Sequence, residues 1–438
     1  MLLTQIPQDF PVRRHRLMAA HPSAVFVLPA HPHWIRNSDV HHPYRQDSCF
    51  YYLTGFDEPK SCVVLVPSQT GSDRMILFVQ PKDSEKEIWE GERYGVEGAK
   101  KVFQADEAYP IEELGSKLPE LFLGAEEVFY RMGFSAEMDQ IVLTALESQR
   151  SRQGRTGRSL LSVQDPRGPV GELRLYKSLE ELIALRRACQ ISALAHRRVM
   201  QEVRPGMREF EVEALVDYIC RKEGCQRLGY GSIVANGKNA ACLHYHSHRD
   251  VLREGELLLM DAGGEYNYYT ADITRTFPVG RHFSKVQAQM YDWVLKAQKE
   301  AIAMARPGVT LPEIHQRVVE VMIEGFLCLG LLEGSPQEIY KRKQFRRFYP
   351  HSTSHWLGMD VHDSGLYMKN GQPRPLEPGM VFTIEPGFYV QPSDFEVPRE
   401  YQNIGIRIED DVLITKTGCE ILTQGVPKER DEIEQLRA

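Results

Sequence analysis

The sequence has no long hydrophobic run and no large excess of either charge. No window approaches the roughly 18 consecutive apolar residues of a membrane span, and the N-terminus lacks the basic and apolar regions of a secretion signal. The net charge is −7 at pH 7 and the pI is about 6.1, which disfavours binding to nucleic acid or to an anionic membrane. We therefore expect a cytoplasmic protein with no nucleic-acid and no membrane partner, acting on small neutral or cationic substrates.

Cysteine pairs and the common catalytic motifs are also missing. The eight cysteines form no Cys-x-x-Cys pair and no zinc-ribbon spacing, so we interpret them as reduced, mostly buried thiols rather than metal ligands. There is no His-Glu-x-x-His, no Gly-x-Ser-x-Gly elbow, no P-loop, and no Gly-x-Gly-x-x-Gly after a strand. Together with the acidic residues described below, these absences favour metal-assisted hydrolysis without a covalent nucleophile.

The length of the chain predicts two domains. At 438 residues, with 42% hydrophobic residues, the chain is too long for one ordinary core and has enough apolar content for two. Residues 1–172 alternate strand-like and helix-like stretches, which predicts an α/β domain with a mixed sheet flanked by helices. Residues 173–438 form the second predicted domain. The strands predicted in the first domain are 24–28, 62–66 and 75–79.

Breaker residues mark the end of the first domain. Residues 150–158 are basic and interrupted by glycine, so we interpret them as a solvated loop rather than a ligand clamp, although they could meet an acidic neighbour in an oligomer. Residues 165–171 contain two prolines and two glycines and are interpreted as a linker. Ser178 and Glu181 then form a capping-box pattern, which predicts a long amphipathic helix towards Val203.

The second domain contains a weak internal repeat. Arg-Pro-Gly occurs at 204–206 and again at 306–308, each time between two helix-like segments. Each half continues with a glycine, five mostly apolar residues and an acid, which is Asp261 in the first half and Glu385 in the second. Two related halves that face each other would bring these acids together, so we predict an α+β domain with a pseudo-twofold repeat. Further helices are predicted near 209–223, 285–305 and 312–329, and β-regions near 231–278 and 381–423.

Four acidic residues stand at the ends of predicted buried strands. Asp261 ends an apolar run and Asp272 enters the next β-type stretch after a Gly-rich turn, which is the pattern of a hairpin carrying both acids. Glu385 follows another apolar run, and alternation places Glu409 with Arg407 on one face of a strand. A lone Asp at a strand end is usually a turn cap, but an acid facing the core is unfavourable unless it is paired or bound to metal.

With one histidine, these acids are about what two adjacent divalent ions need. Hard oxygen donors with a single imidazole favour Mn²⁺, with Co²⁺, Fe²⁺ or Zn²⁺ as alternatives, and two bridged ions suit hydrolysis. A two-metal phosphoesterase would also need cations aimed at phosphate oxygens, whereas we expect Arg275 and Arg407 to pair with acids. The predicted ligands are Asp261, Asp272, His355, Glu385 and Glu409.

More histidines accompany these acids than a core requires. An isolated histidine is most often a satisfied structural residue, but four near the acids favour a functional role. Such groups can hydrogen-bond an oxyanion, move a proton to a leaving nitrogen or orient ligands. The four are His244, His351, His355 and His362.

Several sequence blocks recur in one known family. The blocks are HSTSHWLGMDVHD at 351–363, LEPGMVFTIEPG at 376–387, GIRIEDD at 405–411, and Asp261 with DITRTF at 272–277. They resemble the signatures of the aminopeptidase P family, which belongs to the pita-bread metallopeptidases. RNSD at 36–39, PYRQDS at 43–48 and YLTGF at 52–56 extend the resemblance into the first domain.

The resemblance implies a pita-bread catalytic domain that removes the N-terminal residue from peptides with proline in the second position. A hydroxide bridging two Mn²⁺ ions would attack the Xaa-Pro amide, with Glu385 as proton acceptor. Asp261 would hold one ion, His355 and Glu385 the other, with Asp272 and Glu409 bridging. His244 and His362 would line the proline side of the site and stabilise the tetrahedral intermediate, with His351 close by and Arg407 paired with acids outside the ligand set.

The resemblance also bears on assembly and on the substrate pocket. Trp89 resembles a family tryptophan that reaches a neighbouring subunit's site, which implies a homotetramer in which residues 1–172 serve oligomerisation and substrate access. Gln372 stands where the family commonly has an arginine, with Arg374 two positions further on, so no role is assigned to Arg374. An Xaa-Pro amide lacks an N–H and its ring restricts φ, which explains why a dedicated pocket is needed.

Two alternative functions stay open. A prolidase would need a cation that neutralises the free carboxylate of an Xaa-Pro dipeptide, and the N-terminal matches favour aminopeptidase P instead. A binding module with the same fold but no metal would have lost ligands, whereas all five are present in this sequence.

Overall fold

The computed structural model describes residues 9–68, 71–153 and 162–438. The chain divides into two compact units, Met1–Arg174 and Leu175–Ala438, next to the boundary predicted between residues 172 and 173. All eight cysteines are free thiols and five of them are buried, as predicted. In the part of the chain that the structure describes, no helix is long and apolar enough to cross a membrane.

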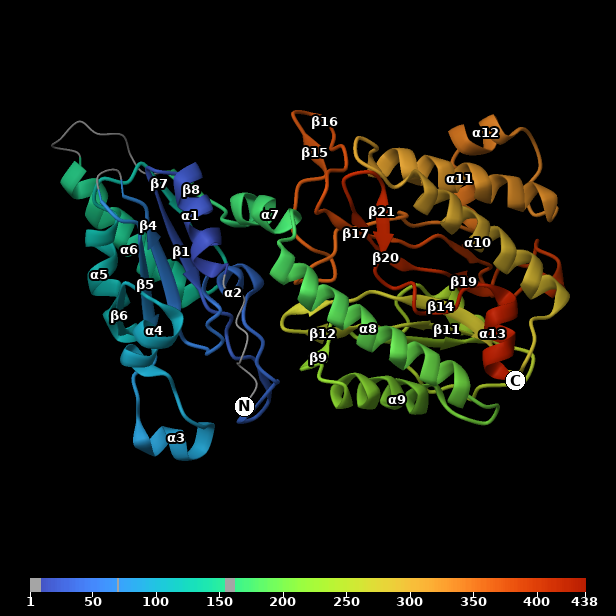
Figure 1. Cartoon of the computed structure of the whole chain (residues 1–438), viewed down its shortest axis with the longest axis horizontal. Helices are drawn as coiled ribbons and strands as arrows, with labels where there is room; N and C mark the ends of the chain where they lie inside the picture. The colour runs from blue at the N-terminus through green and yellow to red at the C-terminus, as the bar shows by residue number, and fades with distance from the viewer. Residues whose placement is uncertain (1–8, 69–70, 154–161) are drawn as a thin grey trace. The chain divides into compact units, whose positions relative to one another are not determined.

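The first unit is built on a six-stranded mixed sheet (Figure 1). Its strands in spatial order are β6 (Glu107–Pro110), β5 (Arg74–Val79), β4 (Cys62–Val66), β1 (Ala24–Pro29), β7 (Glu127–Phe129) and β8 (Ser162–Gln164). The three predicted strands are confirmed, because the apolar runs of β1, β4 and β5 are buried along nearly their whole length. Such continuous burial is typical of strands covered on both faces.

Helices and one small hairpin complete the first unit. The small helix α3 carries Trp89 and has no buried residue. The helices are α1 (Phe10–Ala20), α2 (Ser48–Thr54), α3 (Ser84–Glu90), α4 (Gly95–Phe103), α5 (Leu114–Leu121) and α6 (Ala136–Gln153), and the hairpin is β2 (Ile35–Asn37) with β3 (Val40–His41).

The prediction of a linker before the second unit is wrong. Residues 165–171 enter a helix, α7 (Arg167–Leu175), in which Pro169 stands in the first turn, where a proline is tolerated. The Asp165 carboxylate accepts a hydrogen bond from the Arg167 N–H at the start of this helix. In the predicted basic loop, residues 150–153 instead belong to α6, and residues 154–158 lie outside the described residues.

The four helices predicted in the second unit are confirmed. They are α8 (Leu179–Glu202), α9 (Glu209–Lys222), α10 (Lys285–Met304) and α11 (Leu311–Cys328). The predicted capping box is present: the Ser178 hydroxyl accepts from the Glu181 N–H, and the Glu181 carboxylate accepts from the Ser178 N–H. This pairing satisfies backbone donors that would otherwise lack partners at the start of α8.

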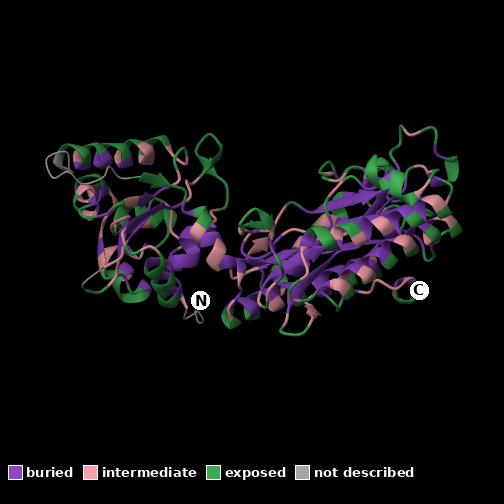
Figure 2. Ribbon diagram, turned by 90° about the horizontal axis from the view of Figure 1, so that it is seen from above, coloured by how far each residue is buried: buried purple, intermediate pink, exposed green. Residues whose placement is uncertain are grey.

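In the second unit, each of the two helix pairs is followed along the chain by a three-stranded sheet. After α8 and α9 comes a three-stranded antiparallel sheet of β10 (Ile233–Asn236), β11 (Leu257–Asp261) and β14 (Thr274–Pro278). After α10 and α11 comes a second one of β17 (Val381–Ile384), β20 (Asp410–Ile414) and β21 (Cys419–Ile421). The strands lie between the two helix pairs, and most of their residues are buried (Figures 1 and 2). This order agrees with the predicted twofold repeat.

Shorter elements connect these sheets. They are β9 (Arg227–Leu228), β12 (Gly264–Tyr266), β13 (Tyr269–Thr270), α12 (Pro336–Lys341), β15 (Met368–Lys369), β16 (Gln372–Pro373), β18 (Gly387–Tyr389), β19 (Gly405–Arg407) and α13 (Arg430–Arg437).

The hairpin predicted to carry two acids is present, but its turn lies elsewhere. β11 and β14 pair antiparallel with Asp261 opposite Thr274, and Asp272 precedes β14. The segment between them folds into the smaller hairpin β12–β13, which turns at Asn267 and Tyr268, both with positive φ. The glycines serve packing instead, because a Cβ at Gly263 would overlap with the carbonyl oxygen of Ala271.

The single strand predicted to carry both Arg407 and Glu409 is broken. β19 pairs with β18 and ends at Arg407, whereas β20 pairs with β17 and begins at Asp410. Glu409 lies between them, and its N–H donates to the Thr274 carbonyl. The chain therefore changes sheet at Glu409, which a simple alternation of apolar residues does not reveal.

Candidate active site

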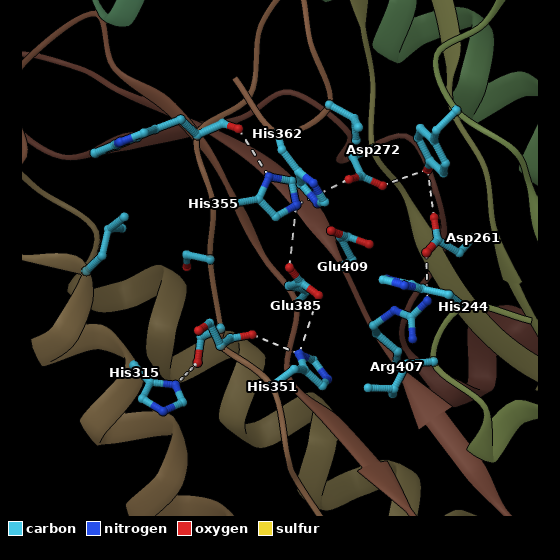
Figure 3. Close-up of a pocket in the computed structure, with 18 of the residues that line it drawn as sticks. His244, Asp261, Asp272, His315, His351, His355, His362, Glu385, Arg407 and Glu409 are labelled. Atoms are coloured by element: carbon cyan, nitrogen blue, oxygen red, sulfur yellow. Dashed lines mark hydrogen bonds and ion pairs between the residues drawn. The ribbon is translucent and has the colours of Figure 1, made fainter. Parts of the chain in front are cut away.

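The second unit contains a cavity of about 870 Å³ that all five predicted ligands line. The five side chains come from both halves of the repeat and point toward one another (Figure 3). One ligand atom from each of Asp272, His355 and Glu409 lies within 4.8 Å of the others. His355 Nε2 is also 3.4 Å from Asp272 Oδ2 and 3.5 Å from Glu385 Oε1. The arrangement is therefore compact enough for shared cations.

A tyrosine that the sequence did not indicate joins two of the acids. The Tyr230 hydroxyl is 2.7 Å from Asp261 Oδ1 and 2.6 Å from Asp272 Oδ1. Burial, followed by the charges of the two aspartates and of Glu409, raises the pKa of Tyr230 well above its usual value. The phenol consequently stays protonated, and it holds the two carboxylates in fixed positions.

The negative charges of the clustered acids are not fully balanced by the cationic side chains beside them. Burial and the charges of Asp272 and Asp261 raise the pKa of Glu385 to about 7, although His355 and Arg407 oppose that shift. The pKa values of Asp272 and Glu409 are also raised, first by burial and then by the other carboxylates. Buried acids that repel one another in this way favour a bound cation, so the residues fit divalent metal ions.

His355 behaves in the opposite way. Burial alone lowers its pKa, but the hydrogen bond to Asp272 and the charge of Glu385 outweigh burial and raise the pKa to about 9. In the protein without metal, His355 is therefore a cation among carboxylates. Deprotonation of His355 would free Nε2, the nitrogen next to Asp272, to bind a metal ion.

The prediction that Arg275 and Arg407 pair with acids is confirmed. Arg275 is fully buried, donates to Asp410 Oδ1 at 2.7 Å and also donates to the Glu409 carbonyl. Arg407 pairs with Asp261 Oδ2 at 2.6 Å. The expectation that Arg407 pairs with acids outside the ligand set is wrong, because its partner is a predicted ligand.

Arg407 also leads to a second tyrosine and to His351. Its guanidinium donates to the Tyr389 hydroxyl at 3.1 Å, and that hydroxyl is 2.9 Å from His351 Nε2. His351 Nδ1 is 2.8 Å from the carbonyl of Ser352, so Nδ1 donates and Nε2 accepts. Burial, then the charge of Arg407, lowers the pKa of His351 to about 3, which keeps this histidine neutral.

The other residues singled out in the sequence differ in exposure. His244 and His362 are exposed residues of the cavity wall, and the His362 ring is 4.5 Å from that of His355, centroid to centroid. Arg374 lines the cavity and is buried, whereas Gln372 is exposed in β16. The Trp89 side chain is 88% exposed in the other unit.

Sequence reasoning missed Tyr230, Tyr389 and a further histidine of the cavity, His315. His315 Nδ1 is 2.8 Å from the hydroxyl of Thr353, between the histidines at 351 and 355 (Figure 3). It lies on α11, where a single histidine among apolar residues carries no pattern. Tyr389 follows Glu385 by four residues, so a search for donors around the predicted ligands could have found it.

Two families match the chain. Residues 183–416 match metallopeptidase family M24. Residues 10–130 match the N-terminal domain of aminopeptidase P. The chain is 42% identical over 432 residues to the Xaa-Pro aminopeptidase of Escherichia coli, with 98% of this chain and 97% of that protein covered. It is 36% identical to the mitochondrial intermediate cleaving peptidase 55 of Arabidopsis thaliana, with 98% and 82% covered.

Solved structures agree with these matches. An aminopeptidase of Pseudomonas aeruginosa aligns with a TM-score of 0.94 at 42% identity, and the alignment covers 99% of both chains. Zinc-substituted aminopeptidase P of E. coli in complex with product aligns with a TM-score of 0.94 at 40% identity, covering 99% of this chain and 98% of that one.

Proposed function

The chain belongs to metallopeptidase family M24 and also carries the N-terminal domain of aminopeptidase P, so we propose that it is a Xaa-Pro aminopeptidase. It releases the N-terminal residue from peptides whose second residue is proline. The observation that carries this proposal is that the five predicted ligands converge on one cavity, in a chain that aligns over 98% of its length with a Xaa-Pro aminopeptidase.

The metal site is proposed to hold two Mn²⁺ ions. Asp261 would bind one ion, His355 and Glu385 the other, and Asp272 and Glu409 both. The repulsion among these buried acids supports this assignment, and the preponderance of oxygen donors favours Mn²⁺ over Zn²⁺. When bound, the ions would supply an activated water and a Lewis acid for the scissile carbonyl.

The chain's own groups would hold the substrate and move protons. Glu385 accepts a proton from the attacking water, since its carboxylate lines the cavity among the proposed metal ligands. His244 and His362 hydrogen-bond the tetrahedral intermediate from the proline side of the cavity. His351 is proposed to support Glu385, since its Nδ1 is 3.6 Å from Glu385 Oε2. Arg407 keeps Asp261 in place through the ion pair described above.

The decisive experiment compares Arg-Pro-Pro with Arg-Pro as substrates of chelator-stripped protein, with and without added Mn²⁺. We expect free arginine from the tripeptide only when metal is present, and no cleavage of the control peptide Arg-Gly-Pro. Preference for the dipeptide would mean a prolidase. Failure to cleave any of them with Mn²⁺, Co²⁺, Fe²⁺ or Zn²⁺ would favour a binding module instead.

The first unit is proposed to serve oligomerisation and substrate access in a homotetramer. The support is the exposure of Trp89 and Ile88 at the end of α3, 88% and 81%, because large apolar side chains so exposed often mark an interface. Sedimentation of the wild type and of Trp89→Ala would measure the assembly. Eight free thiols are consistent with a cytoplasmic location, which fractionation of cells would test.

Without metal, the protein is expected to lose stability as pH rises from 6.5 to 8.5. His355 has a folded pKa of about 9, above its unfolded value, so its stabilisation is complete below about pH 6.5 and is lost towards pH 9. Glu385 acts in the same direction up to about pH 7, because the folded state keeps a proton that the unfolded chain has released.

Bound Mn²⁺ should remove this pH dependence, since metal then replaces the protons of the cluster. Urea unfolding at pH 6.5 and 8.5, with and without Mn²⁺, measures the effect. The assignment of these groups would be contradicted if the free energy of unfolding changed equally with pH with and without Mn²⁺. It would also be contradicted if the metal-free protein became more stable as pH rises.

A further inference from the structure

Lys177 forms a buried ion pair beside the active site. Its Nζ donates to Asp363 Oδ2 at 3.0 Å, and the two side chains are 0% and 1% exposed. Burial of two charges is unfavourable unless their geometry is good, so a pair this deeply buried requires a well-defined position of both side chains. Lys177 stands just before the capping residue of α8 and outside both segments that match known families, 10–130 and 183–416.

The ion pair closes the loop that carries His362. Asp363 is the residue after His362, and its N–H donates to the Trp356 carbonyl at 2.9 Å. Gly358 packs against the pair so closely that a Cβ there would overlap with the Asp363 carboxyl group and lie 3.1 Å from Lys177 Cε. The loop 356–363 thus packs against the Lys177 side chain at both Gly358 and Asp363.

The backbone of Lys177 makes a second connection to the site. Its N–H donates to the Gly379 carbonyl at 2.9 Å. Gly379 lies in the turn before β17, and β17 leads directly to Glu385. One residue therefore contacts both the loop of His362 and the turn that precedes a predicted ligand.

We infer that Lys177 is a positioning residue, whose ion pair with Asp363 fixes His362 against the active site. His362 is exposed, so neighbouring side chains do not hold it from all sides, and its edge-to-face contact with His355 depends on the loop backbone. Rings 4.5 Å apart at 84° require the loop to be held within a narrow range of positions. This inference rests on the proposed function only in that His362 contacts the substrate.

The test is a double-mutant cycle with cleavage of Arg-Pro-Pro. Lys177→Met alone should lower kcat about 10- to 100-fold, the range typical of residues that orient catalytic groups, with KM changed less than about twofold. In the His362→Ala background it should cause no further loss, because the group that it positions is gone. In the His244→Ala background, the matched control, it should cause its full loss. An equal loss in the His362→Ala background would show a general structural role and overturn the inference.

A double variant without either charge controls for misfolding of the single variant. Lys177→Met leaves the Asp363 charge buried, whereas Lys177→Met/Asp363→Asn removes both charges and should fold, as judged by circular dichroism and thermal unfolding. The double variant should show the same loss of kcat and the same insensitivity to His362→Ala. Wild-type kcat in this variant would overturn the inference.

A measurement without metal or substrate separates this inference from the proposed function. The imidazole NMR signal of His362, assigned by its absence in His362→Ala, should shift or broaden in the neutral double variant of the metal-free protein. An unchanged signal would contradict positioning by Lys177, even if the wild type cleaves Xaa-Pro peptides. Failure of the wild type to cleave any peptide would instead refute the proposed function.

Discussion

Glu385→Gln is expected to lower kcat for Arg-Pro-Pro by about 10²- to 10⁴-fold, the contribution of a well-placed general base. Glutamine keeps the shape of the side chain but cannot accept a proton. Glu385 is suited to that task by its position, because it lines the cavity among the other predicted ligands. Its two oxygens also lie 3.5 Å from His355 Nε2 and 3.6 Å from His351 Nδ1, so the carboxylate stands between these two histidines.

Steady-state kinetics at saturating Mn²⁺, with bound metal counted by elemental analysis, would separate lost proton transfer from lost metal. Glu420→Gln is the matched control: it makes the same change in a half-exposed ion pair with Arg186, and its kcat should stay within about twofold of wild type. A Glu385→Gln variant that keeps its metal and more than a tenth of wild-type kcat would rule out Glu385 as the proton acceptor.

Local patterns predicted the helices of the second unit well. The capping box at Ser178 and Glu181 and the apolar periodicity that follows are properties of neighbouring residues, and α8 begins where they place it. The prediction of a linker at residues 165–171 was wrong for a physical reason, since a proline in the first turn of a helix is compatible with helix formation. Proline and glycine content alone therefore did not distinguish α7 from a loop.

The sequence predicted the ligands of the candidate site but not the side chains that hydrogen-bond to those ligands or to their partners. Asp261 and Glu385 were recognisable because an acid at the end of an apolar run is unusual in any core. Tyr230 and Tyr389 had no comparable signal, since a buried tyrosine is common and only its partners in space give it a role. The break at Glu409 was missed for a similar reason, because a strand that changes sheet keeps its apolar alternation.

Replacing Glu409 by glutamine should weaken Mn²⁺ binding more than about 100-fold, beyond the 10- to 100-fold typical of residues that only orient ligands. Activity at limiting metal would fall accordingly. The metal-free variant, however, should be more stable than the metal-free wild type at pH 8. Burial and neighbouring carboxylates raise the pKa of Glu409, so above its unfolded pKa this group lowers the free energy of unfolding.

The two effects have one cause. A buried carboxylate among others is unfavourable in the empty site and favourable around a cation, so the residues that give metal affinity lower the stability of the metal-free fold. Thermal unfolding at pH 8 should therefore show a higher Tm for metal-free Glu409→Gln than for metal-free wild type, and a smaller increase when Mn²⁺ is added. The Thr274 hydroxyl, 2.6 Å from Glu409 Oε2, can donate equally to the glutamine carbonyl, so the substitution keeps this buried hydrogen bond. A metal-free variant less stable than wild type would mean that Glu409 stabilises the fold by itself and would argue against its assignment as a ligand.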